Sequence, residues 1–169
     1  MRSSAWYKSC ADINITIWER TKRTFVQSEE QEGEDRIMEP ETLRKVQERF
    51  QKDRYATENG AVIEEVGEGY ARVGMELDRH HYNAVGGVMG GAVFTIADFA
   101  FAVATNWRGK TVVSQTAQIT YLGRVKGKKM IAEAKEVKDG RSVCYYVVEV
   151  SDELGSKVAH VTSSGFHVD

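Results

Sequence analysis

The stretch that decides the fold is 88–106, VMGGAVFTIADFAFAVATN. It predicts one apolar helix, because the glycines Gly90 and Gly91 are followed by no charged side chain except Asp98 before Arg108. A helix that is apolar on all its faces is a buried helix. A carboxylate inside it is costly to desolvate unless it is paired or hydrogen-bonded, and its pKa should rise. Asp98 is therefore either a satisfied structural group or a functional one.

The composition is that of an ordinary globular protein of 169 residues, with 41% hydrophobic and 28% charged side chains. This length fits one domain with a sizeable core. The net charge of −2 excludes the basic surface of a nucleic-acid-binding protein. We expect no membrane span and no signal peptide. Cys10 and Cys144 show no metal-ligand spacing, so we expect a reduced, cytoplasmic protein without a bound metal.

The chain changes character near residue 38. Residues 1–37 show little periodic pattern and end in an acidic patch, EEQEGED, at 29–35. We expect 1–37 to be a poorly specified N-terminal extension and 38–169 to be the folded domain. The alternative for the extension is a helix that packs on the domain.

The pattern of residues 38–169 predicts an α+β fold. We expect a helix at 40–55, two short strands around the turn at 67–69, a loop at 78–88, the apolar helix, and four long strands after residue 110. Alternation is clear in TVVSQTAQITYL, and Asp139-Gly140 is a hairpin signal. A sheet curled around the single helix would cover most of it, and a partner subunit could cover the rest.

Three positions resemble the hotdog-fold acyl-CoA thioesterases, and among them the PaaI-like thioesterases of phenylacetic acid degradation. Gly90 follows Asn83 by seven residues, and Asp98 follows Gly90 by eight, which is the spacing of that family. The strands in ITYLGRVKGKKMIAEAKEVKDGRSVCYYVVEV and LGSKVAHVTSSGFHV resemble the family as well, so the resemblance covers about 40–169. It implies a hotdog fold, in which an antiparallel sheet of about five to six strands wraps around one long central helix.

The resemblance also implies an activity, the hydrolysis of an aryl- or medium-chain acyl-CoA to a free acid and CoA without a metal or redox cofactor. Asp98 would be the nucleophile or the general base, and the Gly90 N–H would polarise the thioester carbonyl. Asn83 would orient the carboxylate, the water or the thioester. One departure is Met89, which stands where the family often has a histidine and cannot shuttle protons.

Further residues are candidates for substrate contact. Basic side chains near the mouth of the site suit the phosphates of CoA, although exposed turns commonly carry them in any case. Loop histidines such as His80 and His81 lack a third metal ligand at a suitable spacing. We expect Cys144 to be a small buried hydrophobe and His167 to face solvent or a subunit contact. The candidates for substrate contact are Gly91, Met89, Ser114, His81, Arg124, Lys128 and Arg141.

Gly90 and Asp98 are separated by about 12 Å of rise along one helix, too far to touch one thioester carbon. We therefore expect the two residues of one site to come from different subunits. The resemblance agrees, since it implies a homodimer with sites at the interface, often paired again into a homotetramer.

Two other functions are alternatives to thioester hydrolysis. One is an acyl-thioester hydratase or dehydratase, which usually needs an Asp–His pair, and the other is a non-catalytic acyl-CoA-binding or regulatory protein.

Overall fold

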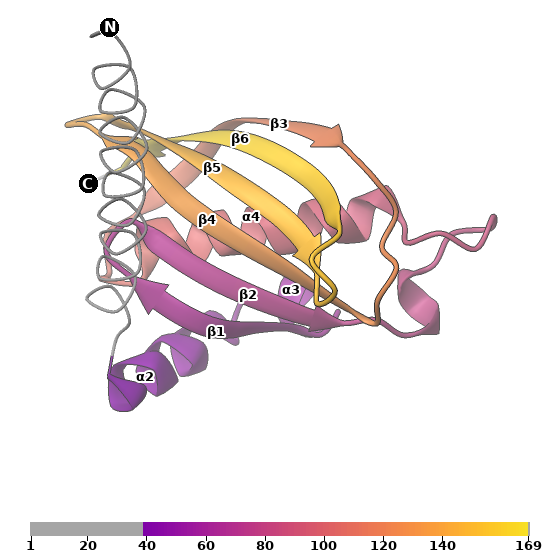
Figure 1. The fold of residues 1–169 in the computed structure, drawn as a ribbon. Helices are drawn as coiled ribbons and strands as arrows, with labels where there is room; N and C mark the ends of the chain where they lie inside the picture. Colours follow the sequence, from indigo (N-terminus) through magenta and orange to yellow (C-terminus); the bar gives the residue numbers. More distant parts are fainter. Residues whose placement is uncertain (1–38, 169) are drawn as a thin grey trace, which may run out of the picture. The chain divides into compact units, whose positions relative to one another are not determined.

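A computed structural model describes residues 39–168, and within them six antiparallel strands form one sheet around a long helix (Figure 1). The α+β fold expected from the sequence is confirmed. The extension expected at 1–37 lies outside the described residues. The strands are β1 (Ala61–Gly67), β2 (Tyr70–Glu76), β3 (Val112–Tyr121), β4 (Lys129–Asp139), β5 (Val143–Asp152) and β6 (Lys157–His167). The helices are α2 (Pro40–Phe50), α3 (Arg54–Thr57), the 3₁₀ turn η1 (Arg79–His81) and α4 (Gly90–Asn106).

The strand order in the sheet is β1-β2-β4-β5-β6-β3. Although β3 precedes β4 in the chain, it pairs with β6, from Val112 opposite His167 to Tyr121 opposite Ala159. This crossover leaves β3 at one edge of the sheet. Of its ten residues only Val112 is buried, and both faces of the strand are otherwise largely exposed. The edge strand beside α4 is therefore free to accept a neighbour.

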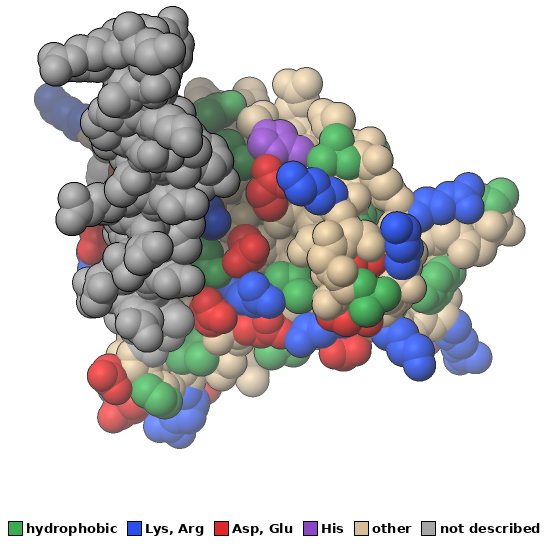
Figure 2. Space-filling view, viewed as in Figure 1, with side chains coloured by type: hydrophobic (Ala, Val, Ile, Leu, Met, Phe, Trp, Pro, Cys, Tyr) green, Lys and Arg blue, Asp and Glu red, His purple; other side chains and the backbone are tan. Residues whose placement is uncertain are grey.

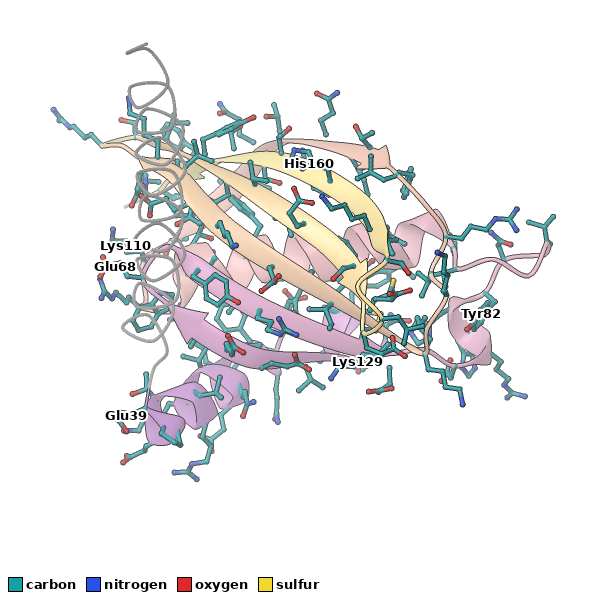
Figure 3. The ribbon with its side chains drawn as sticks, viewed as in Figure 1. Glu39, Glu68, Tyr82, Lys110, Lys129 and His160 are labelled. Carbon is teal, nitrogen blue, oxygen red and sulfur yellow. The ribbon has the colours of Figure 1, made fainter. Side chains whose placement is uncertain are left out.

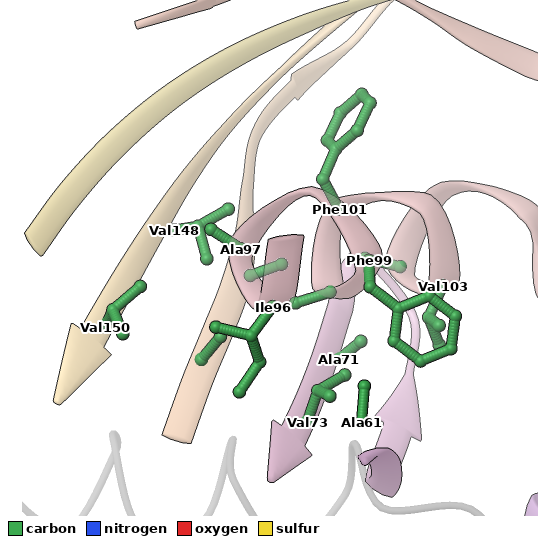
Figure 4. Close-up of a cluster of buried hydrophobic side chains, with 14 of the residues drawn as sticks. Ala61, Ala71, Val73, Ile96, Ala97, Phe99, Phe101, Val103, Val148 and Val150 are labelled. Carbon is green, nitrogen blue, oxygen red and sulfur yellow. The ribbon is translucent and has the colours of Figure 1, made fainter. Parts of the chain in front are cut away.

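The core lies between α4 and the inner face of the sheet (Figure 4). Ile96, Ala97 and Ala100 on α4 are fully buried, and the small alanines let the helix pack closely on the strands. One stripe of α4 is not covered. Its residues are exposed or only partly buried and follow the helical repeat, namely Gly91, Thr95, Asp98 and Ala102. This stripe is the part of the helix that a partner subunit was expected to cover.

The helix expected at 40–55 is broken, so that prediction is wrong in its detail. α2 ends at Phe50 and α3 begins at Arg54. The Phe50 ring packs edge-on against Phe99 of α4, with 5.9 Å between the ring centres. The break lets the chain turn so that Ala56 of α3 is buried in the core as well.

The outer face of the sheet is charged (Figure 2). Arg72 on β2 joins Glu64 on β1 and Glu133 on β4, with N–O distances of 3.1 and 3.2 Å. These neighbouring opposite charges make the outer face hydrophilic, so the apolar contacts and the candidate site lie on the side of α4.

Candidate active site

Asn83 orders the loop that leads into α4. Its Oδ1 accepts hydrogen bonds from the backbone N–H groups of Val85 and Gly87, at 3.0 and 3.1 Å. Gly86 within this loop has a φ of 78°, which glycine adopts without strain. The amide Nδ2 of Asn83 has no partner among the described residues, so it remains able to donate a hydrogen bond to a ligand.

A cavity of about 510 Å³ opens where this loop meets the start of α4. Figure 3 shows Tyr82 at this end of the domain. The phenol Oη of Tyr121, at the end of β3, donates to the carbonyl of Gly90 across 3.0 Å. A Cβ at position 90 would lie 2.8 Å from the Tyr121 Oη, so a larger residue there would displace the tyrosine from this contact. The cavity is lined by residues including Tyr82, Asn83, Gly90, Val93, Tyr121 and Arg124.

The backbone N–H groups of Gly90 and Gly91 have no acceptor within residues 39–168. They are the first donors of α4, where a helix leaves its N–H groups unsatisfied and carries a partial positive charge. Gly90 also lines the cavity. The start of α4 can therefore donate a hydrogen bond to an oxygen with developing negative charge.

Asp98 lies two turns further along α4, on the uncovered stripe, and does not line the cavity. Ser114 on β3 donates its hydroxyl to Asp98 Oδ1 across 3.4 Å. Burial raises the pKa of Asp98, the Ser114 bond lowers it, and the charge of Asp53 raises it, so that the pKa stays above its usual value. Asp98 is a half-buried carboxylate that is available to accept a proton.

Within one chain the predicted site residues therefore form two groups. Asn83, Gly90 and Arg124 share the cavity, whereas Asp98 and Ser114 lie together further along the helix. Gly90 and Asp98 both lie on α4, and the expectation that one site takes them from different subunits stays a prediction.

The remaining predicted contacts lie in different places. Met89 is 55% exposed next to the first turn of α4. Both ring nitrogens of His81 are hydrogen-bonded, Nδ1 as an acceptor from the Asp78 N–H and Nε2 with the carbonyl of Asn59, which precedes β1. This makes His81 a structural residue here, and its contact with substrate stays a prediction. Arg141 follows β4 at the end of that strand opposite to Lys128. Of the basic segment at 124–128, Arg124 and Val125 line the cavity, whereas Lys128 and Arg141 are not among its lining residues.

Two residues that the sequence did not single out hold this end of the domain. Tyr121 fixes the first turn of α4, and Asp152 holds the basic segment. Asp152 is 2% exposed, and its carboxylate accepts the N–H groups of Lys126 and Gly127. Nothing in the local pattern marks either residue, because both contacts join segments far apart in the chain.

Comparison with known proteins decides the family. The family described as "Domain of unknown function (DUF4442)" matches residues 50–165. The chain belongs to this family. A curated protein of Archaeoglobus fulgidus, named "Putative esterase", is 37% identical to this DUF4442 protein over 110 residues, which are 64% of this chain and 71% of that protein.

Solved structures show the same fold. A mutant of the phenylacetic acid degradation protein PaaI from Thermus thermophilus is 31% identical with a TM-score of 0.65, over 69% of this chain and 100% of that one. A hypothetical thioesterase of Streptococcus pneumoniae, solved with coenzyme A, is 22% identical with a TM-score of 0.64, over 70% and 96% of the two chains. The DUF4442 domain therefore has the hotdog fold of the PaaI-like thioesterases, as the resemblance in the sequence implied.

The described helices do not include one that is long and apolar enough to cross a membrane.

Proposed function

We propose that this DUF4442 protein hydrolyses an acyl-CoA thioester to the free acid and CoA. The observation that carries the proposal is Asp98, a half-buried carboxylate of raised pKa on the same helix whose first residue, Gly90, lines a cavity and has an N–H that is unpaired within the described residues. The thioesterase and esterase names of similar proteins support the reaction class.

The roles follow from the chemistry of each group. The Gly90 N–H donates to the thioester oxygen, which gains negative charge as a nucleophile attacks the carbonyl carbon. As a general base, Asp98 takes a proton from the attacking water, the C–O bond forms, and the C–S bond then breaks. The departing thiolate receives that proton, which leaves the acid and CoA. As a nucleophile, Asp98 instead attacks the carbonyl carbon, and the C–S bond breaks to release CoA as the thiolate and leave an acyl anhydride on Asp98. Water then hydrolyses the anhydride, which restores the Asp98 carboxylate, frees the acid and supplies the proton that the thiolate takes up.

The CoA part of the substrate has its own support. Arg124 lines the cavity, and a guanidinium is suited to bind phosphate oxygens in pairs. Lys126 and Lys128 follow on the same segment. A similar protein from Streptococcus pneumoniae was solved with coenzyme A bound, which supports a CoA thioester over a simple ester.

We infer that the working form is a dimer in which each site takes Asp98 from one chain and Gly90 from the other. The uncovered stripe of α4 and the exposed edge strand β3 lie side by side and could meet the same surfaces of a second copy. Co-expression of two inactive variants, Asp98→Asn and Asn83→Ala, would then restore part of the activity, because one of the two mixed sites is intact. Mixed preparations as inactive as each variant alone would contradict the composite site.

The central experiment measures release of free thiol from a panel of aryl- and medium-chain acyl-CoA substrates. Asp98→Asn should lower kcat by about 10²–10⁴-fold, the usual contribution of a general acid or base. Asp53→Asn is the matched control, because it removes a nearby carboxylate that does not touch the proposed site, and its kcat at neutral pH should be unchanged. CoA binding without thiol release across the panel would instead favour a non-catalytic binding protein.

A further inference from the structure

A second group of reactive side chains lies far from the cavity. Asp139, Cys144 and His167 each offer one ligand atom, and these atoms lie within 4.8 Å of one another. His167 Nε2 and Asp139 Oδ1 are 2.7 Å apart. The three residues stand at the adjoining ends of β4, β5 and β6. Figure 3 shows Lys110, whose Nζ is 3.5 Å from Asp139 Oδ2, at the end of the domain opposite Tyr82.

A shift in strand register creates this group. Residues that pair directly across a sheet point to the same face. Glu136 pairs with Tyr146, but the register then shifts, and Asp139 pairs with Cys144. Without the shift Glu136 and Asp139, three positions apart, would point to opposite faces. With the shift both carboxylates lie on the face of the buried Cys144, as is common where a bulge re-aims a side chain.

His167 reaches the same face from β6. Its backbone N–H bonds to the carbonyl of Ser142, two residues before Cys144, so the side chains of His167 and Cys144 share one side of the sheet. Cys144 is 1% exposed, whereas the side chains of His167 and Asp139 are 15% and 30% exposed. A hollow of about 40 Å³ beside Lys110 reaches Asp139 and Glu136. The Cys144 sulfur is thus shielded from solvent, whereas solvent reaches the group from the side of the Asp139 and Glu136 carboxylates.

The donor set is selective. A thiolate, an imidazole and a carboxylate together suit Zn²⁺, while Mg²⁺ and Ca²⁺ prefer oxygen alone. Around one tetrahedral ion the ligand atoms would be about 3.3–3.6 Å apart, given Zn–S and Zn–N bonds of about 2.3 and 2.0 Å. The 2.7 Å between Asp139 Oδ1 and His167 Nε2 is shorter than that value, and all three ligand atoms lie within 4.8 Å of one another. Small side-chain rotations of Asp139 and His167 would therefore close the group on an ion.

We propose that Asp139, Cys144 and His167 bind a thiophilic divalent cation, Zn²⁺ by the chemistry of the ligands, with the fourth position held by water or Glu136. The bound ion joins the ends of three adjacent strands. Binding converts the Cys144 thiol to a thiolate and displaces the proton that His167 Nε2 shares with Asp139. The chain spacing hides this site, because the ligands are 5 and 23 residues apart and meet only through the pairing of the strands.

The test is a titration of the full-length, reduced, metal-free protein with Co²⁺ and then with Zn²⁺. Co²⁺ should give the near-ultraviolet charge-transfer absorption of a cobalt–thiolate bond, saturating at one ion per chain, and Zn²⁺ should abolish it. Cys144→Ser should remove this absorption, and Asp139→Asn and His167→Gln should each weaken binding by about tenfold or more. Zn²⁺ should also raise the Tm of the wild type more than that of Cys144→Ser.

Two variants serve as controls. Cys10→Ala removes the other cysteine of the chain, and His160→Gln removes a histidine that pairs with Glu149 instead. Both should keep the wild-type spectrum, and thiol release from acyl-CoA should be unchanged in Cys144→Ser. Absence of a thiolate band from the wild type, or its persistence in Cys144→Ser, would overturn the metal site whatever the outcome of the thioesterase assay.

Discussion

Ser114 on the edge strand β3 donates its hydroxyl to Asp98 on α4 across 3.4 Å. This bond joins the exposed edge of the sheet to the uncovered stripe of the helix. The bond and burial have opposite effects on the pKa of Asp98, because burial raises that pKa and the Ser114 bond lowers it. Ser114 therefore offsets part of the rise that burial causes in the pKa of Asp98.

Ser114→Ala should move the acid limb of the rate profile to higher pH. Removal of a hydrogen bond to the carboxylate favours the protonated form, so the pKa of Asp98 rises further. Asp98 acts as a carboxylate in either proposed role, so the variant needs a higher pH to reach its plateau. The measurement is kcat/KM for an acyl-CoA from pH 4 to pH 9. Thr116→Val is the control, because Thr116 bonds to Ser164 on β6 instead. If the acid limb moves equally in both variants, the shift does not come from loss of the hydrogen bond between Ser114 and Asp98.

Asp53→Asn should have the opposite effect on the same profile. The negative charge of Asp53 raises the pKa of Asp98, so its neutralisation lowers that pKa and moves the acid limb to lower pH. The shift should shrink as ionic strength rises, because salt screens a charge that acts through space. The plateau at neutral pH should not change. A limb that stays in place at low salt would show that Asp53 and Asp98 are not coupled.

Arg124→Gln should raise KM for acyl-CoA by about tenfold, the size expected for the loss of one charge-assisted hydrogen bond. KM for the matching N-acetylcysteamine thioester, which lacks the nucleotide phosphates, should change little. Arg141→Gln is the comparison, since Arg141 lies at the far end of β4 from the cavity in the same chain. A similar rise in KM for both thioesters would mean that Arg124 does not bind the phosphates.

The sequence located the strands and the central helix because local patterns decide them. Alternating side chains mark β3 and β5, and the turn between β1 and β2 contains Gly69 at a φ of 63°, a conformation that favours glycine. The apolar run with its two glycines likewise predicted α4 and its start. Each of these features depends on a few neighbouring residues, so the sequence is enough to find them.

Features that depend on pairing between distant segments were not predictable. Alternation in β3 does not say that its partner is β6, and the helix at 40–55 has no proline or glycine where it breaks. In the sequence Asp139 and Cys144 show no relation. The register shift after Glu136 places Asp139 on the same face of the sheet as Cys144. His81 looked available for a ligand, but its ring is held by the N–H of Asp78 in its own turn and by the carbonyl of Asn59, 22 residues earlier in the chain.

Asp152 supports a prediction about stability and pH. Its carboxylate accepts N–H groups from Lys126 and Gly127 on one side and from Leu154 and Ser156 on the other, at 2.7–3.2 Å. Burial alone would raise the pKa of Asp152, but these N–H groups lower it to about 2. Asp152 thus joins the basic segment near the cavity to the turn between β5 and β6.

Asp152→Asn should lower the Tm by several degrees near pH 7, because an amide cannot accept at both positions and leaves buried N–H groups unpaired. A folded-state pKa below the unfolded value of about 3.9 gives stability that is present above pH 4 and lost as the pH falls towards 2. The Tm difference between wild type and variant should therefore be largest at neutral pH and narrow steadily below pH 4. Thermal unfolding from pH 2 to pH 7 measures it, with the exposed Glu68→Gln as control. A difference that stays constant over this range would show that the charge of Asp152 does not stabilise the fold.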